Sequence, residues 1–573
     1  MNIERVSAVP AIMVAAMAMS APAVAQTASQ LTPPSFAPQV RQLPEGGVAV
    51  EAAPGLETPP GADALTVTLK EVTVEGGRAE LEAQSRALAA PLAGHPIKVS
   101  DLFAAARAIQ GLYARAGYVL ARVTVPAQTL NDGTSARLVV LDGFIERIDI
   151  RAVPKAIRGR VEALLAPLNG KRGVTLGEIE RALVLAGELP GTQLRSALEA
   201  GKEPGGTVLT IEAYHQSVTA QLTIDNGLGH SLGHVSAGLG VQLNSVAGLG
   251  EQIYLFANGY PGGGYLTGHP RNRALAGGIL LPLTPDGLVL NLEAVNTRAT
   301  PEAMVGALGT TSRFERYSAR LRYAVARRRA YTLDAEIGFD LQEDRQDLIS
   351  PIVAPFSLDR LRILRVKAGG TWFTPWNGTL RADATASFGL AGLGARTAAD
   401  ATFLQPLSRE GADADFQRLE AQLTYRQPFG PHLGASIAFD GQTSFGNPLL
   451  VSEQLGLAQS SGLSTFDAGS IQGDSGYVAR GEVISPWGFR LGPDSVSIAP
   501  YAFGAIGTAH LEMPTALERA NVTGKSYGLG IRLGAATPAS FRGASLTLEW
   551  GRRERNDGSP AGNRFTATAA IQL

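Results

Sequence analysis

The segment from Phe565 to Leu573 alternates between apolar residues and small or polar ones. An alternation with period two is the pattern of a β-strand with one apolar face and one wet face. The same pattern recurs from Val218 onwards, between turns that are rich in Gly, Pro and Asn. A chain that ends on such a strand, with many similar ones before it, is most simply an outer-membrane β-barrel.

An export signal precedes this region. Arg5 supplies a charged start, the short stretch from Val6 to Met19 is apolar, and Ala23-Val24-Ala25 has the small-x-small pattern of a cleavage site. The apolar stretch is too short to span a membrane as a helix. We therefore expect residues 1–25 to be a cleavable signal peptide, and we expect no transmembrane helix after it.

The composition limits the possible functions. The chain has no cysteine, which excludes disulfides, thiolate metal sites and a thiol nucleophile. Its formal net charge of −1 argues against a nucleic-acid partner. Charged residues make up 18% of the chain, and its 67 glycines suit strands and tight turns. We expect no cofactor, no metal and no enzymatic activity.

Residues 26–63 form a proline-rich stretch that lacks the apolar surface needed to fold alone. The sequence predicts a flexible or extended linker here. A second interpretation remains open, in which the segment docks elsewhere in the protein, for example in a pore.

Residues 64–142 predict a compact α/β unit. Its expected elements are a strand at Leu65–Leu69, a helix at Glu80–Leu88, a helix that Ser100 caps and Gly117 ends, and strands at Val119–Val125 and Ala136–Leu141 joined by a turn at Asn131-Asp132-Gly133. Residues 143–214 repeat this β-α-α-β-β order. The elements expected there are a strand at Ile145–Ile150, helices at Ala156–Leu165 and Leu176–Ala186, and strands at Gln193–Leu198 and Val208–Glu212.

Residues 215–573 predict an all-β antiparallel transmembrane barrel. Alternation is clear at Val218–Asp225, Tyr317–Tyr323, Leu419–Tyr425 and Leu546–Trp550. We expect about sixteen strands, with an error of about two, because single-chain barrels have even strand numbers. A soluble β-sandwich also alternates, but it rarely needs so many strands in one domain.

Several motifs resemble a known family, the two-partner secretion transporters that include the haemolysin and filamentous-haemagglutinin exporters. The motifs are Tyr113-Ala114-Arg115-Ala116-Gly117-Tyr118 with Arg122, Pro126, Gln128, Asp132-Gly133 and Gly143; Asp225-Asn226-Gly227 with Asn244 and Gly248-Leu249-Gly250-Glu251-Gln252; and Gly473-Asp474-x-Gly476-Tyr477-x-x-Arg480-x-Glu482. The first set is similar to the first POTRA domain of that family. The others are similar to its first barrel strands and to the strand after its long, inward-folded loop.

The resemblance implies the architecture and the sites. Residues 64–142 and 143–214 would be POTRA 1 and POTRA 2 in the periplasm, and 215–573 the barrel. POTRA 1 would bind the client through Tyr113, Gly117, Tyr118, Gln128 and Gly143. POTRA strand edges can accept an extended chain by strand addition, and a sixteen-stranded barrel can enclose a lumen wide enough for it.

The inward loop departs from the family pattern. The family carries a Val-Arg-Gly-Phe/Tyr tetrad there, and the nearest segment in this chain is Leu463-Ser464-Thr465-Phe466, without the arginine. The acid usually found on the next strand is replaced by Ala505. Loss of both members of a buried pair is physically coherent, because loss of one alone would strand a charge. We expect the loop to be held differently, with Phe466 packing as one candidate, and Gly473, Asp474 and Gly476 at its end. A changed gating mechanism and a changed function are the alternatives.

Three charged or polar segments could be functional sites. Gly473-Asp474-Ser475-Gly476 is similar to a serine-protease loop, but a barrel strand is the stronger interpretation. Arg327-Arg328-Arg329 predicts a turn at the barrel rim. The acidic cluster from Asp340 to Asp347 predicts a solvated loop.

We therefore expect an outer-membrane transporter that exports a large, β-rich partner protein and that contacts membrane lipid and works as a monomer. A barrel assembly factor is one alternative, although two POTRA units are few for that role. A passive porin with periplasmic gating domains is another.

Overall fold

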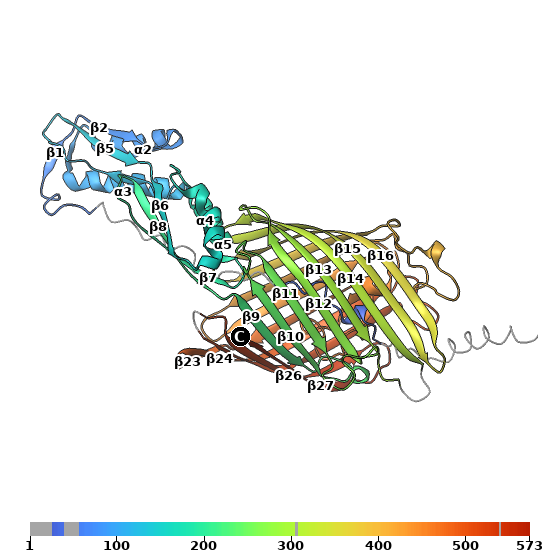
Figure 1. Cartoon of the computed structure of the whole chain (residues 1–573). Coiled ribbons are helices and arrows are strands. Elements are labelled where there is room, and N and C mark those ends of the chain that lie inside the picture. Colours follow the sequence, from blue (N-terminus) through green and yellow to red (C-terminus); the bar gives the residue numbers. More distant parts are fainter. Residues whose placement is uncertain (1–25, 39–56, 304–307, 538–539) are drawn as a thin grey trace, which may run out of the picture.

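A computed structural model describes residues 26–38, 57–303, 308–537 and 540–573. Two small α/β units lead into a tilted β-barrel and lie beyond one of its mouths (Figure 1). The predicted signal peptide at 1–25 lies outside the described residues. Within the described residues, no helix combines the length and apolarity that crossing a membrane requires.

The first unit packs two helices on a small mixed sheet. Its elements are β1 (Thr66–Thr68), β2 (Glu71–Gly76), η2 (Ala79–Leu81), α2 (Glu82–Ala89), η3 (Ala90–Leu92), β3 (Pro96–Lys98), α3 (Val99–Arg115), β4 (Arg122–Thr124) and β5 (Ser135–Leu141). The sheet order is β2-β5-β4, while β1 pairs only with β3. Leu102 and Ile109 on α3 are fully buried in the core, as the helical spacing predicts.

The strand predicted at Leu65–Leu69 is β1, which pairs with β3 outside the three-stranded sheet. One expectation for this unit was wrong. Helix α3 begins at Val99, before Ser100, because the Asp101 carboxylate accepts a hydrogen bond from the Lys98 N–H at 2.9 Å and caps the helix.

The second unit has all the elements that the sequence predicts. They are β6 (Phe144–Ala152), α4 (Lys155–Leu165), η4 (Ala166–Leu168), α5 (Leu176–Gly187), β7 (Thr192–Ala200) and β8 (Gly206–His215). The sheet order is β6-β8-β7. Thr175 caps α5 by accepting from the Glu178 N–H, while the Glu178 carboxylate accepts from the Thr175 N–H.

The rest of the chain closes into a barrel. Its strands are β9 (Val218–Asp225), β10 (Ser236–Asn244), β11 (Gln252–Gly259), β12 (Asn272–Pro282), β13 (Leu288–Ala299), β14 (Gly309–Arg327), β15 (Tyr331–Ser350), β16 (Ala354–Phe373), β17 (Thr379–Gly389), β18 (Gln417–Pro428), β19 (Gly434–Thr443), β22 (Ser475–Ile484) with its continuation β23 (Trp487–Leu491), β24 (Asp494–His510), β25 (Asn521–Ala536), β26 (Gly543–Arg555) and β27 (Gly562–Gln572). Because β22 and β23 both pair with β24, the barrel has 16 antiparallel strands, which confirms the predicted number. Strand β27 pairs with β9 and closes it.

The alternation assigns the two faces of the wall. On β13, Leu292 is 42% exposed while its neighbour Glu293 is 4% exposed, and on β14 Tyr317 is 55% exposed beside the buried Arg316. The apolar positions therefore face outward, where lipid would lie, and the charged positions face the lumen. The acidic cluster at Asp340–Asp347 is part of β15, so the loop predicted there was wrong, and Asp340 is buried on the lumen side.

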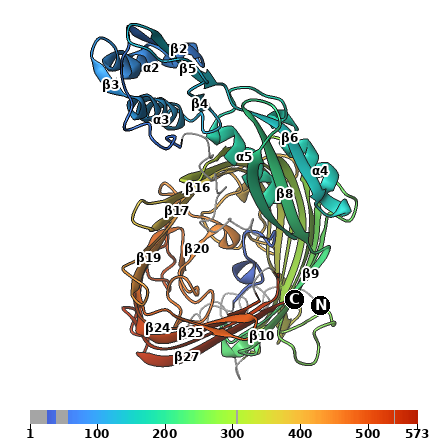
Figure 2. The same ribbon diagram turned by 90° about the vertical axis from the view of Figure 1, so that its left-hand side faces the viewer.

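Two segments lie inside the barrel. The described residues 26–38, which include η1 (Ser29–Leu31), lie within the ring of strands, as does the loop between β19 and β22 (Figure 2). That loop carries η7 (Val451–Glu453), β20 (Leu455–Gly456) and β21 (Gln472–Gly473). Residues 26–38 thus match the second interpretation of the proline-rich stretch, whose residues 39–56 lie outside the described part.

Candidate functional site: the barrel lumen

The N-terminal segment, residues 26–38, contacts the wall through polar groups. The Ala28 N–H donates to Ser312 Oγ at 2.8 Å, and the Thr32 hydroxyl donates to the Thr297 hydroxyl at 2.8 Å. Ala28 is also packed with Leu232 and Phe314 in a small apolar cluster. The segment is therefore anchored at a defined place on the wall.

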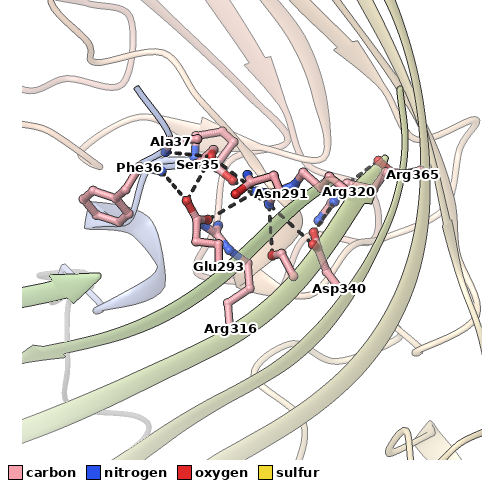
Figure 3. Close-up of polar contacts among 12 residues, drawn as sticks. Ser35, Phe36, Ala37, Asn291, Glu293, Arg316, Arg320, Asp340 and Arg365 are labelled. Carbon is pink, nitrogen blue, oxygen red and sulfur yellow. Dashed lines mark hydrogen bonds and ion pairs between the residues drawn. The ribbon is translucent and has the colours of Figure 1, made fainter. Parts of the chain in front are cut away.

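Glu293 on β13 is the centre of a second contact with this segment (Figure 3). Its Oε2 accepts from the Phe36 N–H at 2.7 Å and from the Ser35 hydroxyl at 3.0 Å. Arg316 and Arg320 on β14 lie 3.1 and 3.3 Å from its Oε1. The same two guanidinium groups donate to the carbonyl oxygens of Pro33 and Pro34, each at 3.0 Å.

A row of ion pairs continues from this contact along the wall. Arg320 lies 3.4 Å from Asp340 on β15, and Arg365 on β16 lies 2.7 Å from Asp340 and 2.8 Å from Glu453. Glu453 belongs to η7 of the inward loop and also pairs with Arg418 on β18 at 3.1 Å. The row therefore joins the anchor of the N-terminal segment to the anchor of the loop.

The N-terminal segment and the loop also touch directly. The Gln26 amide donates to the Ala468 carbonyl oxygen, and the Gln30 amide donates to the Gln472 side-chain oxygen. Ala468 and Gln472 both lie in the inward loop. Movement of either occupant would therefore break contacts made by the other.

The end of the loop is fixed by Asp474, which is fully buried. Its carboxylate accepts from Arg409 Nη1 at 2.8 Å, from the Glu512 N–H at 2.7 Å and from the Leu449 N–H at 3.0 Å. The flanking glycines lie against β24: a Cβ would be 2.7 Å from the His510 carbonyl oxygen at Gly473 and 2.3 Å from the Thr508 carbonyl oxygen at Gly476.

The Leu463-Ser464-Thr465-Phe466 segment is held by the wall. Leu463 and Phe466 are buried in one apolar cluster with residues of β22 and β24. The Thr465 hydroxyl donates to Ser526 Oγ at 2.8 Å. Ser464, where the resemblance predicts an arginine, accepts from Arg480 Nη1 of β22 at 2.7 Å.

Arg480 is itself fixed from the wall side. Its Nη2 lies 2.6 Å from Glu549 on β26 and its Nε 2.8 Å from Glu482. Its guanidinium carbon lies 4.1 Å from the centre of the Phe503 ring. Ala505, in place of the family acid, packs against the apolar cluster. The arginine that holds this loop therefore comes from the wall, and the loop supplies a hydroxyl.

Sequence reasoning missed most of the charged wall. The residues not singled out were Glu293, Arg316, Arg320, Arg365, Arg418 and Glu453. Arg316 and Arg320 lie four residues apart on one face of a strand, which was a usable signal. Their partners lie on other strands, so only the register of the barrel brings them together.

In the first α/β unit, three of the motif residues are used internally. Tyr113 is 1% exposed, and its hydroxyl accepts from the Arg78 N–H at 2.9 Å. A Cβ at Gly143 would be 1.9 Å from the Leu120 carbonyl oxygen. Gln128 makes two hydrogen bonds to the main chain of Arg137 on β5, at 2.9 and 3.0 Å. These three residues stabilise the fold of the unit, and their contacts within it leave few groups that could bind another chain.

The remaining two motif residues lie where α3 ends. Gly117 has a φ of 94°, a left-handed conformation that suits glycine. The Tyr118 hydroxyl donates to Glu80 at 2.8 Å, and Arg78 lies over the Tyr118 ring.

The second α/β unit contacts the barrel rim. Arg327 ends β14, as the predicted rim turn requires, and lies 2.7 Å from Glu188 of this unit and 2.7 Å from Asp334. Arg181 of α5 donates to the carbonyl oxygen of Ala324 at 2.7 Å. Burial raises the pKa of Glu188 above the usual range, although Arg327 opposes this.

Comparison with known proteins places this architecture in a family. A family model for the POTRA domain, ShlB-type, matches residues 67–143, and one for the haemolysin secretion/activation protein ShlB/FhaC/HecB matches residues 205–531. The outer membrane transporter CdiB of Escherichia coli O6:K15:H31 is 26% identical over 247 residues, which cover 42% of this chain and 40% of that relative. The heme/hemopexin transporter protein HuxB of Haemophilus influenzae is 23% identical over 165 residues, or 28% of this chain and 29% of that relative.

Solved structures show the same fold. CdiB from Escherichia coli superposes with a TM-score of 0.70 at 18% identity, over 92% of this chain and 94% of that chain. CdiB from Acinetobacter baumannii superposes with a TM-score of 0.57 at 15% identity, over 94% of both chains. The family model for the haemolysin secretion/activation protein ShlB/FhaC/HecB matches more than half of the 573 residues. The chain therefore belongs to this family.

Proposed function

We propose that this protein is an outer-membrane transporter that exports a partner protein by two-partner secretion. The observation that carries the proposal is the charged lumen of a closed barrel, held shut by two segments of the same chain. Polar contacts between these segments and the wall can be exchanged for water or for a passing chain, whereas a packed apolar core could not be opened so readily.

The POTRA domains, 64–142 and 143–214, capture the unfolded client on the periplasmic side. Among the described strands, β2 and β6 lie at sheet edges, and on the outer edge of β6 only Phe144 and Ile145 form bridges, to Arg172 and Asn169. Such an edge can add an extended client through main-chain hydrogen bonds, which tolerate many sequences. Tyr113, Gly117, Tyr118, Gln128 and Gly143 serve this step by fixing the shape of POTRA 1, so we assign them an indirect role.

The inward loop serves as a plug in the barrel domain, 215–573. Leu463, Ser464, Thr465 and Phe466 hold its tip, and Gly473, Asp474 and Gly476 fix its end. Release of the tip would let the loop move while its end stays attached. The client is a large, β-rich protein, the outer wall contacts membrane lipid, and the protein works as a monomer without nucleic acid. The matched family consists of secretion proteins, and we propose no catalytic activity for this member.

A deletion strain tests the export function. Secreted and outer-membrane proteins of the deletion strain, the parent and a strain complemented with the wild-type chain are compared by quantitative mass spectrometry. We expect one large extracellular protein to disappear in the deletion strain and to return on complementation, with other barrels unchanged. A broad fall in other barrels would instead indicate an assembly factor. An unchanged proteome would contradict export and leave a passive porin as the function to test.

A further inference from the structure

The wall contacts to residues 33–36 are made mainly to main-chain atoms. Arg316 and Arg320 donate to the carbonyl oxygens of Pro33 and Pro34, and Glu293 accepts from the Phe36 N–H. Two side chains of the segment also contact the wall. The Ser35 hydroxyl donates to Glu293, and the centre of the Phe36 ring lies 5.0 Å from that of the Phe256 ring. Main-chain groups are present in every polypeptide, so contacts of this kind do not depend on sequence.

The wall groups that make these contacts are held in place by the barrel. Glu293 on β13 lies opposite Ser318 on β14, and Arg316 and Arg320 occupy positions two residues to either side of Ser318. All three charged groups are buried, and Arg320 is fixed from behind by Asp340. The two donors and one acceptor therefore keep their spacing through contacts that do not involve the N-terminal segment.

The contact between the wall and residues 33–36 lies in the barrel lumen. Arg316 and Arg320 line a lumen cavity of ≈ 670 Å³ that the segment and the inward loop share. No strand of the barrel pairs with the described residues 26–38, so departure of this segment breaks no ladder of the wall. Its departure leaves one buried carboxylate and two guanidinium groups without their peptide partners, and such groups favour replacement partners.

We infer that Glu293, Arg316 and Arg320 form a binding subsite for extended polypeptide main chain. Residues 33–36 occupy this subsite at rest, and a segment of the exported client takes their place once they leave. This inference rests on the proposed export function, since only a transported chain would reach the lumen. The subsite forms hydrogen bonds with two carbonyl oxygens and one N–H of the main chain. It therefore accepts an extended chain of varied sequence.

The test uses synthetic peptides and the mature chain without residues 27–38, reconstituted in planar bilayers. The first probe has the sequence of residues 27–38. The second carries Thr and Leu at the positions of Ser35 and Phe36, so it keeps a hydroxyl that can donate to Glu293. The third has an ester in place of the amide between Ser35 and Phe36, which removes the N–H that donates to Glu293. Block of the ion current by each peptide gives its Kd.

We expect the first two peptides to block with similar Kd values and the ester peptide to bind about tenfold more weakly, because it lacks a hydrogen bond to a charged group. Glu293→Gln should reduce this difference between amide and ester, because a neutral amide oxygen accepts a weaker hydrogen bond than a carboxylate does. Glu336→Gln is the matched control, because Glu336 lines the same cavity without a hydrogen bond to the described residues 26–38. Heat-modified migration on gels confirms that each variant is a folded barrel.

Equal block by the amide and ester peptides, or the same difference in Glu293→Gln as in Glu336→Gln, would overturn the inference. So would a failure of all peptides to block a folded, conducting pore. These results are independent of secretion: a strain without a secretion defect contradicts the export function, whereas absence of peptide block contradicts the subsite alone.

Discussion

At the scale of single residues, an arginine of the wall holds the inward loop. The resemblance to the family predicts an arginine in the loop and an acid on the wall at the positions that Ser464 and Ala505 occupy. Arg480 of the wall donates to Ser464 at 2.7 Å, and Ala505 joins the apolar cluster that buries Phe466. Both predicted pair positions are thus uncharged in this chain, and the charged residues of the loop, Glu453, Asp467 and Asp474, each have a partner.

Phe466→Ala tests whether packing holds the loop tip. Removal of a buried Phe side chain costs about 3–5 kcal/mol in a packed core, so the tip should detach more often. We expect more frequent channel openings in planar bilayers and greater leakage of antibiotics into cells. Phe445→Ala is the matched control, since Phe445 belongs to the same loop but is 60% exposed. Identical conductance in the two variants would show that Phe466 does not hold the plug.

Gly143→Ala tests the structural role of a POTRA 1 motif residue. The added Cβ would be 1.9 Å from the Leu120 carbonyl oxygen, so the backbone must shift and the domain must lose stability. We expect faster hydrogen exchange throughout 67–143 in the full chain and reduced secretion. Gly159→Ala is the control, because its Cβ would meet nothing within 4 Å and α4 tolerates alanine. Unchanged exchange in Gly143→Ala would contradict this role.

At the scale of elements, alternation predicts strands well and leaves the lumen contacts unpredicted. The segment Val218–Asp225 is β9 with the predicted bounds, because one face of the strand points outward and the other points into the lumen. The charges of the cluster at Asp340–Asp347 predict a solvated loop, whereas the barrel places Asp340 between two arginines. Pairs such as Arg365–Glu453 join distant parts of the chain, and single-sequence patterns carry no signal for them.

Arg327→Gln tests the contact between POTRA 2 and the barrel rim. Arg327 is buried and joins Glu188 to Asp334, so its loss leaves two carboxylates without their partner, at a cost of about 3–5 kcal/mol. Because the chain has no cysteine, one spin label on α4 and one on the rim can report the distance between them. We expect a broader distance distribution than in the wild type or in Arg329→Gln, its neighbour in the same turn. A distribution as narrow as that of the wild type would show that this contact does not position POTRA 2.

At the scale of the whole molecule, the barrel wall and the two segments inside it form one connected assembly. The N-terminal segment contacts the wall at Glu293, the loop contacts it at Glu453 and Asp474, and the two occupants touch through Gln26 and Gln30. The row of ion pairs across β13, β14, β15 and β16 links both anchors. An exporter built in this way would open by exchanging internal polar contacts for contacts with its client.

The most direct test of this account locks the N-terminal segment in the lumen. Thr32 and Thr297 are joined by a hydrogen bond between their hydroxyls at 2.8 Å, so the double variant Thr32→Cys/Thr297→Cys brings two thiols together in an otherwise cysteine-free chain. The measurement is the amount of the partner protein in the medium, with and without reductant, against each single variant. The account predicts that the locked protein secretes almost none and that reductant restores secretion to the level of the single variants. Equal secretion from the locked and reduced forms would contradict export through this lumen.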